Sequence, residues 1–259
     1  MAATETIRVG TLNLRNTDRW WPRSELLAAQ MLALRPDAIG LQEIKPLARQ
    51  ADWLVEQVNK GLDPPHYRLL EEPKTGFLMR FWEAIGTMTR LPVVERSRLD
   101  LHGGHRVAQR VRLGLPNGAI LDFYNTHLHH SAGAGDLRTA QAQRIFEFMD
   151  RWPGVPQVLV GDFNADPGEP AIQLLSEKLH SAYLMRHGSE ISTSPAPLSS
   201  LWGKEERVID FVFVNDLVEV HDAWRTFDAP DPKNPRLSAS DHYGIAAEIS
   251  VKAGPGPGS

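Results

Sequence analysis

The sequence predicts a mixed α/β fold in which two β-sheets are covered by helices. Short apolar runs typical of buried strands alternate irregularly with a few longer stretches of helical periodicity. With 42% hydrophobic and 23% charged residues, a chain of 259 residues can bury a sizeable core. Polar residues at the expected strand ends run from Asn13 to His242 without a boundary between them. We therefore expect one domain over residues 1–252.

The composition limits the classes of partner and site. A net charge of −4 gives no global basic field for nucleic acid, and the absence of cysteine excludes disulfides and thiolate metal sites. No signal-peptide core begins the chain and no run reaches membrane-spanning length, so a cytoplasmic protein without a membrane span is expected. A monomer is also expected. Residues 253–259, rich in Gly and Pro, are expected to form a flexible tail.

The first two strands are expected to frame one helix. Residues 7–12 form a short apolar run that ends on Asn13, which is typical of a buried strand. Ser24 is the expected N-cap of the following helix, because apolar residues recur after it at helical spacing, and Pro36 ends that helix. Residues 37–43 then indicate a second buried strand, which delivers a glutamate to its end.

A helix and three short strands are expected next. The helix covers residues 47–59, and its buried side includes Leu47. The strands are expected over residues 84–89, 106–113 and 120–124. The third strand delivers His127, and a helix follows from Asp136, its expected N-cap, to about residue 152.

Residues 158–164 carry the most informative pattern in the chain. The apolar residues 158–160 predict a buried strand that stops at Gly161 and delivers Asp162 and Asn164 to its end. Because side chains alternate along a strand, these two point to the same side, at the edge where α/β sheets place their chemistry. A carboxylate and an amide facing one spot suit a phosphate, a metal or an attacking water. The alternative is a turn in which both side chains bond to the local backbone.

The last part of the chain adds one buried acid. A helix is expected over residues 170–179 and a long surface loop over residues 187–206. Asp210 stands inside the apolar strand 208–214, and a buried carboxylate is costly unless it is paired or bound to a metal. A histidine is the expected partner. The last strand, over residues 245–251, follows the triplet Ser240-Asp241-His242.

The oxygen-bearing strand ends point to a hard metal ion. Carboxylate and amide oxygens, in a chain without cysteine, favour magnesium or manganese over zinc. The candidate ligands are Glu43, Asp241 and Asn13.

Six short motifs, taken together, resemble one known family. They are Leu12-Asn13, Leu41-Gln42-Glu43, Asn125-Thr126-His127-Leu128, Gly161-Asp162-Phe163-Asn164, Val208-Ile209-Asp210-Phe211 and Ser240-Asp241-His242. In this order the chain resembles the endonuclease/exonuclease/phosphatase superfamily over residues 7–251. The resemblance implies an α+β fold, a four-layer sandwich of two mixed sheets packed face to face between helices. It also implies hydrolysis of phosphodiesters or phosphomonoesters with a divalent metal, Mg²⁺ or Mn²⁺.

By position, the resemblance implies roles for individual residues. Glu43 resembles the principal metal ligand of the family, with Asn13 and Asp241 close to the metal or its waters. Asp162 and Asn164 resemble the pair that orients the attacking water and the phosphate.

The same resemblance implies two histidine roles and one exclusion. His242 resembles the family's histidine that is paired with an acid, and Asp210 resembles that acid. His127 matches the histidine that contacts the phosphate or protonates the leaving group in the nuclease and phosphatase branches. Abasic-site endonucleases have a tyrosine in this region and an aspartate where Arg15 stands here, so a dedicated abasic-site enzyme is not expected.

The sequence leaves the substrate open. A nuclease fits the seven arginines that stand against three acids between residues 80 and 112, although these arginines could also be the solvated side of two strands. A phosphatase or phosphodiesterase acting on an inositol phosphate, a nucleotide or a lipid headgroup fits the acidic total. A non-catalytic binding module is the third alternative. Four aromatic residues could stack on bases or apolar headgroups, or pack at the rim: Trp20, Trp21, Phe81 and Trp82.

Overall fold

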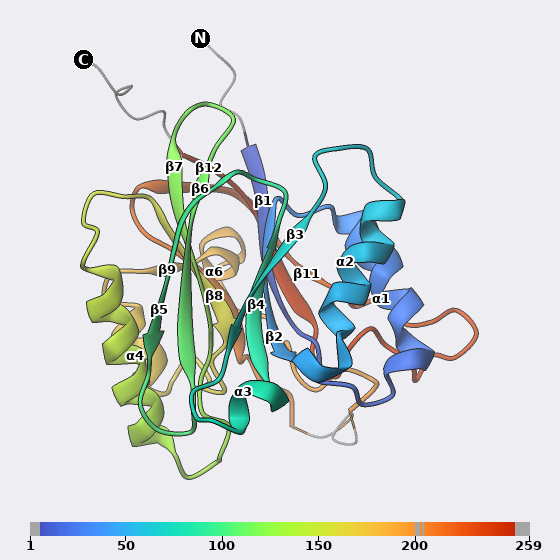
Figure 1. The fold of residues 1–259 in the computed structure, drawn as a ribbon. Coiled ribbons are helices and arrows are strands. Elements are labelled where there is room, and N and C mark those ends of the chain that lie inside the picture. Colours follow the sequence, from blue (N-terminus) through green and yellow to red (C-terminus); the bar gives the residue numbers. More distant parts are fainter. Residues whose placement is uncertain (1–5, 200–202, 204, 252–259) are drawn as a thin grey trace.

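The computed structural model describes residues 6–199, 203 and 205–251. Two six-stranded sheets pack face to face, and helices lie on their outer sides (Figure 1). The four-layer fold predicted from the sequence is therefore confirmed. The expected tail at residues 253–259 lies outside the described residues. Within the described part of the chain, no helix is long and apolar enough to cross a membrane.

The first sheet brings the N-terminal strand into a central position. Its strand order is β11-β12-β1-β2-β4-β3. The strands are β1 (Thr6–Asn13), β2 (Ala38–Ile44), β3 (Arg68–Pro73), β4 (Ala84–Thr89), β11 (Val218–Thr226) and β12 (Gly244–Val251). β1 and β2 are parallel, so both carry their carboxyl ends, with Asn13 and Glu43, to the same edge of the sheet.

The second sheet aligns three of the predicted site residues. Its order is β5-β6-β7-β8-β10-β9. The strands are β5 (Val93–Asp100), β6 (Val107–Gly114), β7 (Ile120–His127), β8 (Gln157–Asp162), β9 (His180–Ser181) and β10 (Asp210–Val214). The register pairs Asp162 with His127 on one side and with Asp210 on the other. Three ionisable side chains are thus placed side by side by backbone pairing alone.

Helices cover both sheets and close three apolar cores. One core lies between the sheets, a second under α1 and α2, and a third under α4 and α5. The helices are α1 (Trp20–Leu34), α2 (Gln50–Lys60), α3 (Met79–Trp82), α4 (Gly135–Met149), α5 (Pro170–Leu175) and α6 (Ala182–His187), with a 3₁₀ turn, η1 (Pro46–Ala48). The sheets and the helices packed on them together support the strand ends.

Two glycines allow the close approaches that the site needs. A Cβ on Gly40 of β2 would lie 2.4 Å from the Val160 side chain of β8, so the sheets approach closely there. A Cβ on Gly161 would lie 2.2 Å from the Thr126 carbonyl oxygen of β7. Gly161 therefore lets the strand that carries Asp162 lie tightly against the strand that carries His127.

Both predicted helix caps are wrong. α1 begins at Trp20, with Arg19 in a left-handed conformation and no side-chain cap, and Ser24 lies inside the helix. Trp20 packs edge-on against Trp53 of α2, and this burial fixes the earlier start. α4 begins at Gly135, so Asp136 lies in its first turn, where a carboxylate interacts favourably with the helix dipole. α4 ends at Met149, three residues before the predicted end.

The expected helix over residues 47–59 is interrupted. Arg49 adopts a left-handed conformation between η1 and α2, and Leu47, predicted to be buried, is exposed. The segment 187–206, predicted as a surface loop, buries Thr193, Ala196 and Leu198, and Ser194 bridges to residue 207. The polar composition of this segment does not indicate that these residues pack against the rest of the protein.

Six elements had no clear sequence signal. They are β3, β5, β9, β11, α3 and α6. β3, β5 and β9 lie at sheet edges and β11 lies beside β12 at another edge, where only one side is paired and alternation is weak. α3 and α6 are short, and the Gly-capped end of α6 falls where the long loop was expected.

Candidate active site

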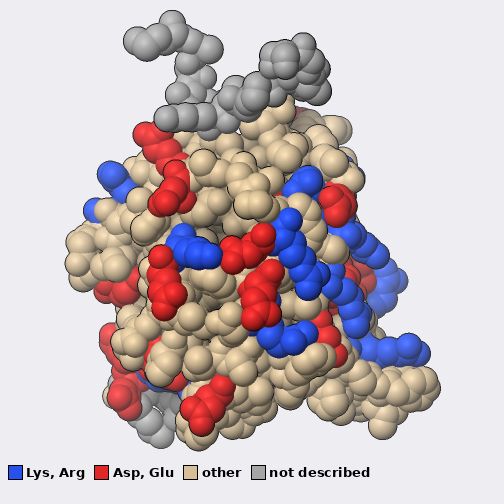
Figure 2. Space-filling view, turned by 90° about the vertical axis from the view of Figure 1, so that its left-hand side faces the viewer, with Lys and Arg blue, Asp and Glu red and all other residues tan. Residues whose placement is uncertain are grey.

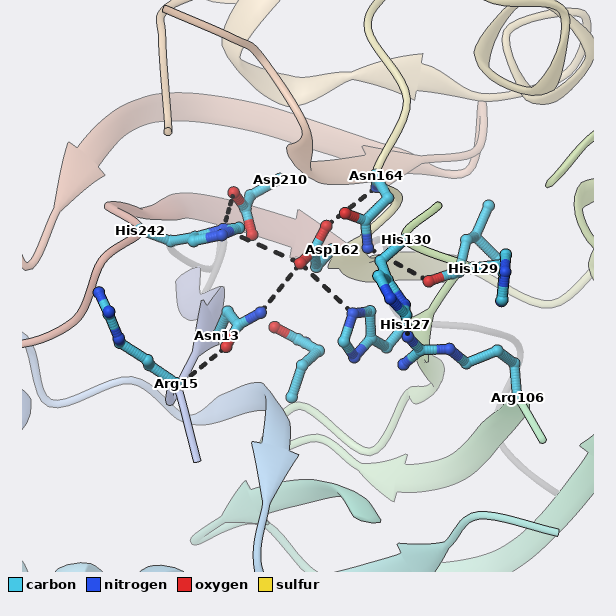
Figure 3. Close-up of polar contacts among 12 residues, drawn as sticks. Asn13, Arg15, Arg106, His127, His129, His130, Asp162, Asn164, Asp210 and His242 are labelled. Carbon is cyan, nitrogen blue, oxygen red and sulfur yellow. Dashed lines mark hydrogen bonds and ion pairs between the residues drawn. The ribbon is translucent and has the colours of Figure 1, made fainter. Parts of the chain in front are cut away.

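The site is built around the carboxylate of Asp162, which is almost fully buried. Its Oδ2 accepts a hydrogen bond from Asn13 Nδ2 at 2.9 Å and lies 3.5 Å from His127 Nε2. Its Oδ1 accepts the backbone N–H of Asn164 at 2.9 Å. Figure 3 shows Asn13, His127 and His242 directed at this carboxylate from different sides. Residues from both sheets thus meet at one acid.

Asp210 has the histidine partner that its buried position requires. His242 Nδ1 lies 2.9 Å from Asp210 Oδ2 and 3.9 Å from Asp162 Oδ2. Burial alone would lower the pKa of His242, but the charge of Asp210 and its hydrogen bond raise this pKa well above the ordinary value. Asp210 therefore favours the protonated form of His242, in which Nδ1 donates to Asp210.

Burial and the charge of Asp210 raise the pKa of Asp162 to about 6, against the opposing effects of His242 and Asn13. A carboxylate with this pKa is ionised at pH 7, yet it is a stronger base than an exposed aspartate. Asp162 is therefore matched to proton transfer near neutral pH.

His127 is held in a different state. Burial, followed by the charges of Arg106 and Lys74, lowers the pKa of His127 well below its ordinary value. His127 Nδ1 lies 3.6 Å from Glu83 Oε1, and the same oxygen pairs with Lys74 Nζ at 2.6 Å and Arg106 Nη1 at 3.0 Å. A neutral imidazole is thus placed beside two cations and the acid that joins them.

Glu83, Lys74 and Arg106 were not predicted as site residues. Glu83 had a weak signal, since it is a charged residue immediately before the apolar strand predicted over residues 84–89. Lys74 lies after β3, an edge strand that the sequence did not reveal. Arg106 was predicted as one of several arginines on a strand face, yet its side chain is buried.

Glu43 lies at the end of β2 in a left-handed conformation, with φ of 55°. Burial, and then the negative charges of Glu83 and Asp241, raise the pKa of Glu43 to about 7. Several acids therefore crowd one place without enough positive charge to balance them. A hard divalent cation would relieve this repulsion and use the oxygen donors present, so the donor set fits a metal at Glu43.

The other two predicted metal ligands are partly engaged. Asn13 Oδ1 accepts the backbone N–H of Arg15 at 2.8 Å. Asp241 Oδ2 lies 3.3 Å from Arg15 Nη1, and Arg15 Nε also pairs with Asp18 at 2.8 Å. The guanidinium of Arg15 therefore already supplies positive charge beside Asp241.

A group of three side chains other than the predicted metal ligands brings its potential ligand atoms close together. Among the described residues, one group of three acid or histidine side chains has its ligand atoms within 4.8 Å of one another, and it consists of Asp162, Asp210 and His242. The hydrogen bond between His242 and Asp210 already uses two of these ligand atoms.

The loop after His127 is held by two side chains of α4. Arg138 and Gln141 of α4 are both buried. Gln141 Oε1 accepts the backbone N–H of His129 at 3.0 Å, and Arg138 Nη1 donates to the Ser131 carbonyl oxygen at 2.9 Å. His130 Nδ1 lies 3.2 Å from Arg106 Nη2, so the loop also contacts the cations beside His127. α4 therefore fixes one wall of the site.

Comparison with known proteins identifies the family. The model of the endonuclease/exonuclease/phosphatase family matches residues 10–242, which is nearly all of the chain. The chain belongs to the endonuclease/exonuclease/phosphatase family. The matched range includes Asn13 and His242, the first and last predicted site residues.

The chain is similar to proteins that carry different names. Carbon catabolite repressor protein 4 homolog 3 of Arabidopsis thaliana is 27% identical over 169 residues, which are 61% of this chain and 36% of the relative's length. D. rerio TDP2, solved with a single-strand DNA product, is 15% identical with a TM-score of 0.79, covering 95% of this chain and 100% of that chain. A mannosyl-6-phosphatase from Bacteroides thetaiotaomicron is 20% identical with a TM-score of 0.72, covering 94% and 99%. These two structures show the shared fold.

Proposed function

We propose that this family hydrolase is a divalent-metal-dependent phosphodiesterase that cleaves by in-line attack of an activated water, with residues 1–252 as one catalytic domain. The observation that carries the proposal is the Asp162 carboxylate, which is bonded by Asn13 and lies between His127 and the His242–Asp210 pair. Acid, amide and imidazole groups directed at one point suit an attacking water and a phosphate.

Asp162 is the proposed base. The charge and hydrogen bond of Asp210 favour the protonated form of His242, which has no free lone pair to accept a proton, whereas the carboxylate of Asp162 can accept one. The water oxygen attacks phosphorus, its proton passes to Asp162, and the bond from phosphorus to the leaving oxygen breaks. The His242 imidazolium can donate to the leaving oxygen or to a phosphate oxygen.

The amides and His127 are proposed to hold the phosphate. Asn13 and Asn164 carry N–H groups at the site, and a neutral His127 can donate one hydrogen bond without adding charge. When bound at Glu43, with Asn13 and Asp241 nearby, Mg²⁺ or Mn²⁺ would neutralise phosphate charge and polarise the P–O bond.

A substrate smaller than a long nucleic acid is the second candidate, and the pairing of the arginines favours it. Of the seven arginines between residues 80 and 112, five form ion pairs with acids. These pairs are Arg90–Asp37, Arg98–Glu72, Arg106–Glu83, Arg110–Asp122 and Arg112–Asp122. Figure 2 shows Asp and Glu side chains interleaved with Lys and Arg on the side of the molecule that carries β5. This surface has little free positive charge for a phosphate backbone.

One hydrolysis panel tests the proposal. It holds plasmid DNA, single-stranded RNA, a generic aryl phosphodiester and an inositol phosphate, each with Mg²⁺, with Mn²⁺ and with chelator. We expect diester cleavage with either metal and its loss with chelator. Cleavage of nucleic acid should weaken steeply with salt, and cleavage of a small diester much less. Metal-independent cleavage, or cleavage of monoesters alone, would overturn the proposal.

The pH dependence follows from the ionisation of Asp162. The active form is the carboxylate, so kcat/KM should fall about tenfold per pH unit below about 6, where Asp162 becomes protonated, and should level off above it. The profile of the generic diester at saturating Mg²⁺ measures this. A profile that is flat from about pH 5 to about pH 8 would contradict the role of Asp162 as base.

A further inference from the structure

Beside the site, six apolar side chains form an exposed surface that we call the ledge. It consists of Leu47, Phe77, Leu78, Met79, Phe81 and Trp82. Five of them lie on or just before α3, which packs next to η1, the turn that carries Leu47. α3 lies at the lower edge of the molecule in Figure 1. Clustered apolar groups on a soluble domain mark an interaction surface more often than chance exposure does.

The ledge contributes little to the core of the protein. The exposed fractions are 75% for Phe77, 63% for Leu78 and 66% for Leu47, and no ledge residue belongs to the buried set of the three cores. Aliphatic and aromatic side chains are mixed in it. A surface that is to receive flat bases needs rings, whereas contact with acyl chains uses aliphatic and aromatic side chains equally well.

The ring faces of the ledge are already partly covered by the protein's own cations. The guanidinium of Arg80 lies 5.0 Å from the ring centre of Phe77 and 4.6 Å from that of Phe81. The ammonium of Lys45 lies 4.8 Å from the ring centre of Trp82. These contacts leave less open ring surface for base stacking. Insertion between lipids needs apolar area and leaves the cations at headgroup level.

The charge of the ledge points to an anionic partner. Arg80 and Lys45 make no ion pair with an acid among the described residues, and the nearby exposed Arg49 pairs only with Asp52. Apolar side chains with basic neighbours are the usual composition of a surface that binds anionic lipid.

We propose that the ledge docks the protein onto an anionic lipid surface. Trp82, at the end of the ledge, directly precedes Glu83, whose carboxylate lies 3.6 Å from His127. A lipid surface in contact with the ledge would therefore lie beside the site and could present a phosphoester to it. Docking itself rests on the ledge and not on the proposed chemistry.

Vesicle flotation without substrate and with chelator tests docking apart from catalysis. The vesicles contain phosphatidylcholine with about 30% phosphatidylserine. We expect the wild-type protein to float with them, and Phe77→Ser combined with Leu78→Ser to lower the partition coefficient about tenfold or more. Leu184→Ser with Met185→Ser on α6, which are 45% and 52% exposed, is the matched control and should bind like wild type.

Further binding experiments distinguish docking onto anionic lipid from binding of a nucleic acid. Arg80→Gln with Lys45→Gln should weaken binding to anionic vesicles, and vesicles of phosphatidylcholine alone should bind less protein. Absence of wild-type binding, or equal binding by the Phe77/Leu78 variant, would overturn the inference. So would a single-stranded oligonucleotide that binds wild type and loses affinity for this variant, because the ledge would then be a base platform. The diester assay of each variant shows that the site remains intact.

Discussion

His242→Ala is expected to lower kcat for the diester about 10²–10⁴-fold while the fold survives. The substitution removes the imidazolium that lies 3.9 Å from the Asp162 carboxylate and can donate to the leaving or phosphate oxygen. It also leaves the buried carboxylate of Asp210 without its hydrogen-bond partner. Single-turnover rates at saturating Mg²⁺ measure the loss in the chemical step.

A second histidine–aspartate pair provides the control. His180 Nε2 lies 2.8 Å from Asp216 Oδ1 at an exposed position of β9, away from the strand ends that form the site. His180→Ala should leave kcat within about twofold of wild type, because surface ion pairs contribute little. Urea unfolding of both variants tests the fold. If a folded His242→Ala protein keeps near-full hydrolysis, His242 has no part in proton transfer.

The site residues that could be predicted from the sequence lie within or at the ends of strands with a clear apolar pattern. Val158 to Val160 are apolar enough to predict a buried strand, and Asp162 follows at its end, as the structure has it. Asn164 lies beyond the strand in a left-handed conformation, so strand alternation does not apply to it. Asp210 could be found because an acid in an apolar strand needs a partner, and that partner is His242. The positions of Asp162 and Asp210 could be predicted because each is indicated by the residues of its own strand.

The residues that the sequence missed are placed by tertiary pairing. Glu83 joins Lys74, Arg106 and His127 only because β3, β4, β6 and β7 bring four distant segments together. Nothing in the local sequence of Lys74 indicates this. The early start of α1 has the same cause, because packing of Trp20 on Trp53 outweighs the capping preference of Ser24.

Glu43→Gln should have opposite effects on activity and on stability. The amide removes the negative charge that would hold Mg²⁺, so kcat/KM at about 1 mM metal should fall about 10²–10⁴-fold, which corresponds to the several kcal/mol that a metal supplies. Titration calorimetry should show weaker Mg²⁺ binding by the variant. Retained tight binding and activity would assign the metal to other residues.

The stability effect follows from the pKa of Glu43, which burial and neighbouring acids raise to about 7 from the ordinary value of 4.5. A carboxyl with a raised folded-state pKa contributes its full stability below about pH 4.5 and loses it as pH rises through about 7. In chelator at about pH 8, the wild-type protein therefore carries a partly buried, repelled charge that the Gln variant lacks. The variant should be about 1–3 kcal/mol more stable to urea there, and the difference should disappear near pH 4.5.

Magnesium should reverse this order of stability. A cation that binds only the folded wild-type protein adds to its free energy of unfolding, while the variant gains little. Glu56→Gln, at an exposed position of α2, controls for the chemical change and should respond to pH and Mg²⁺ like wild type. If Glu43→Gln is destabilised in chelator at about pH 8, the charge of Glu43 is already balanced by the protein, and the site does not need a cation there.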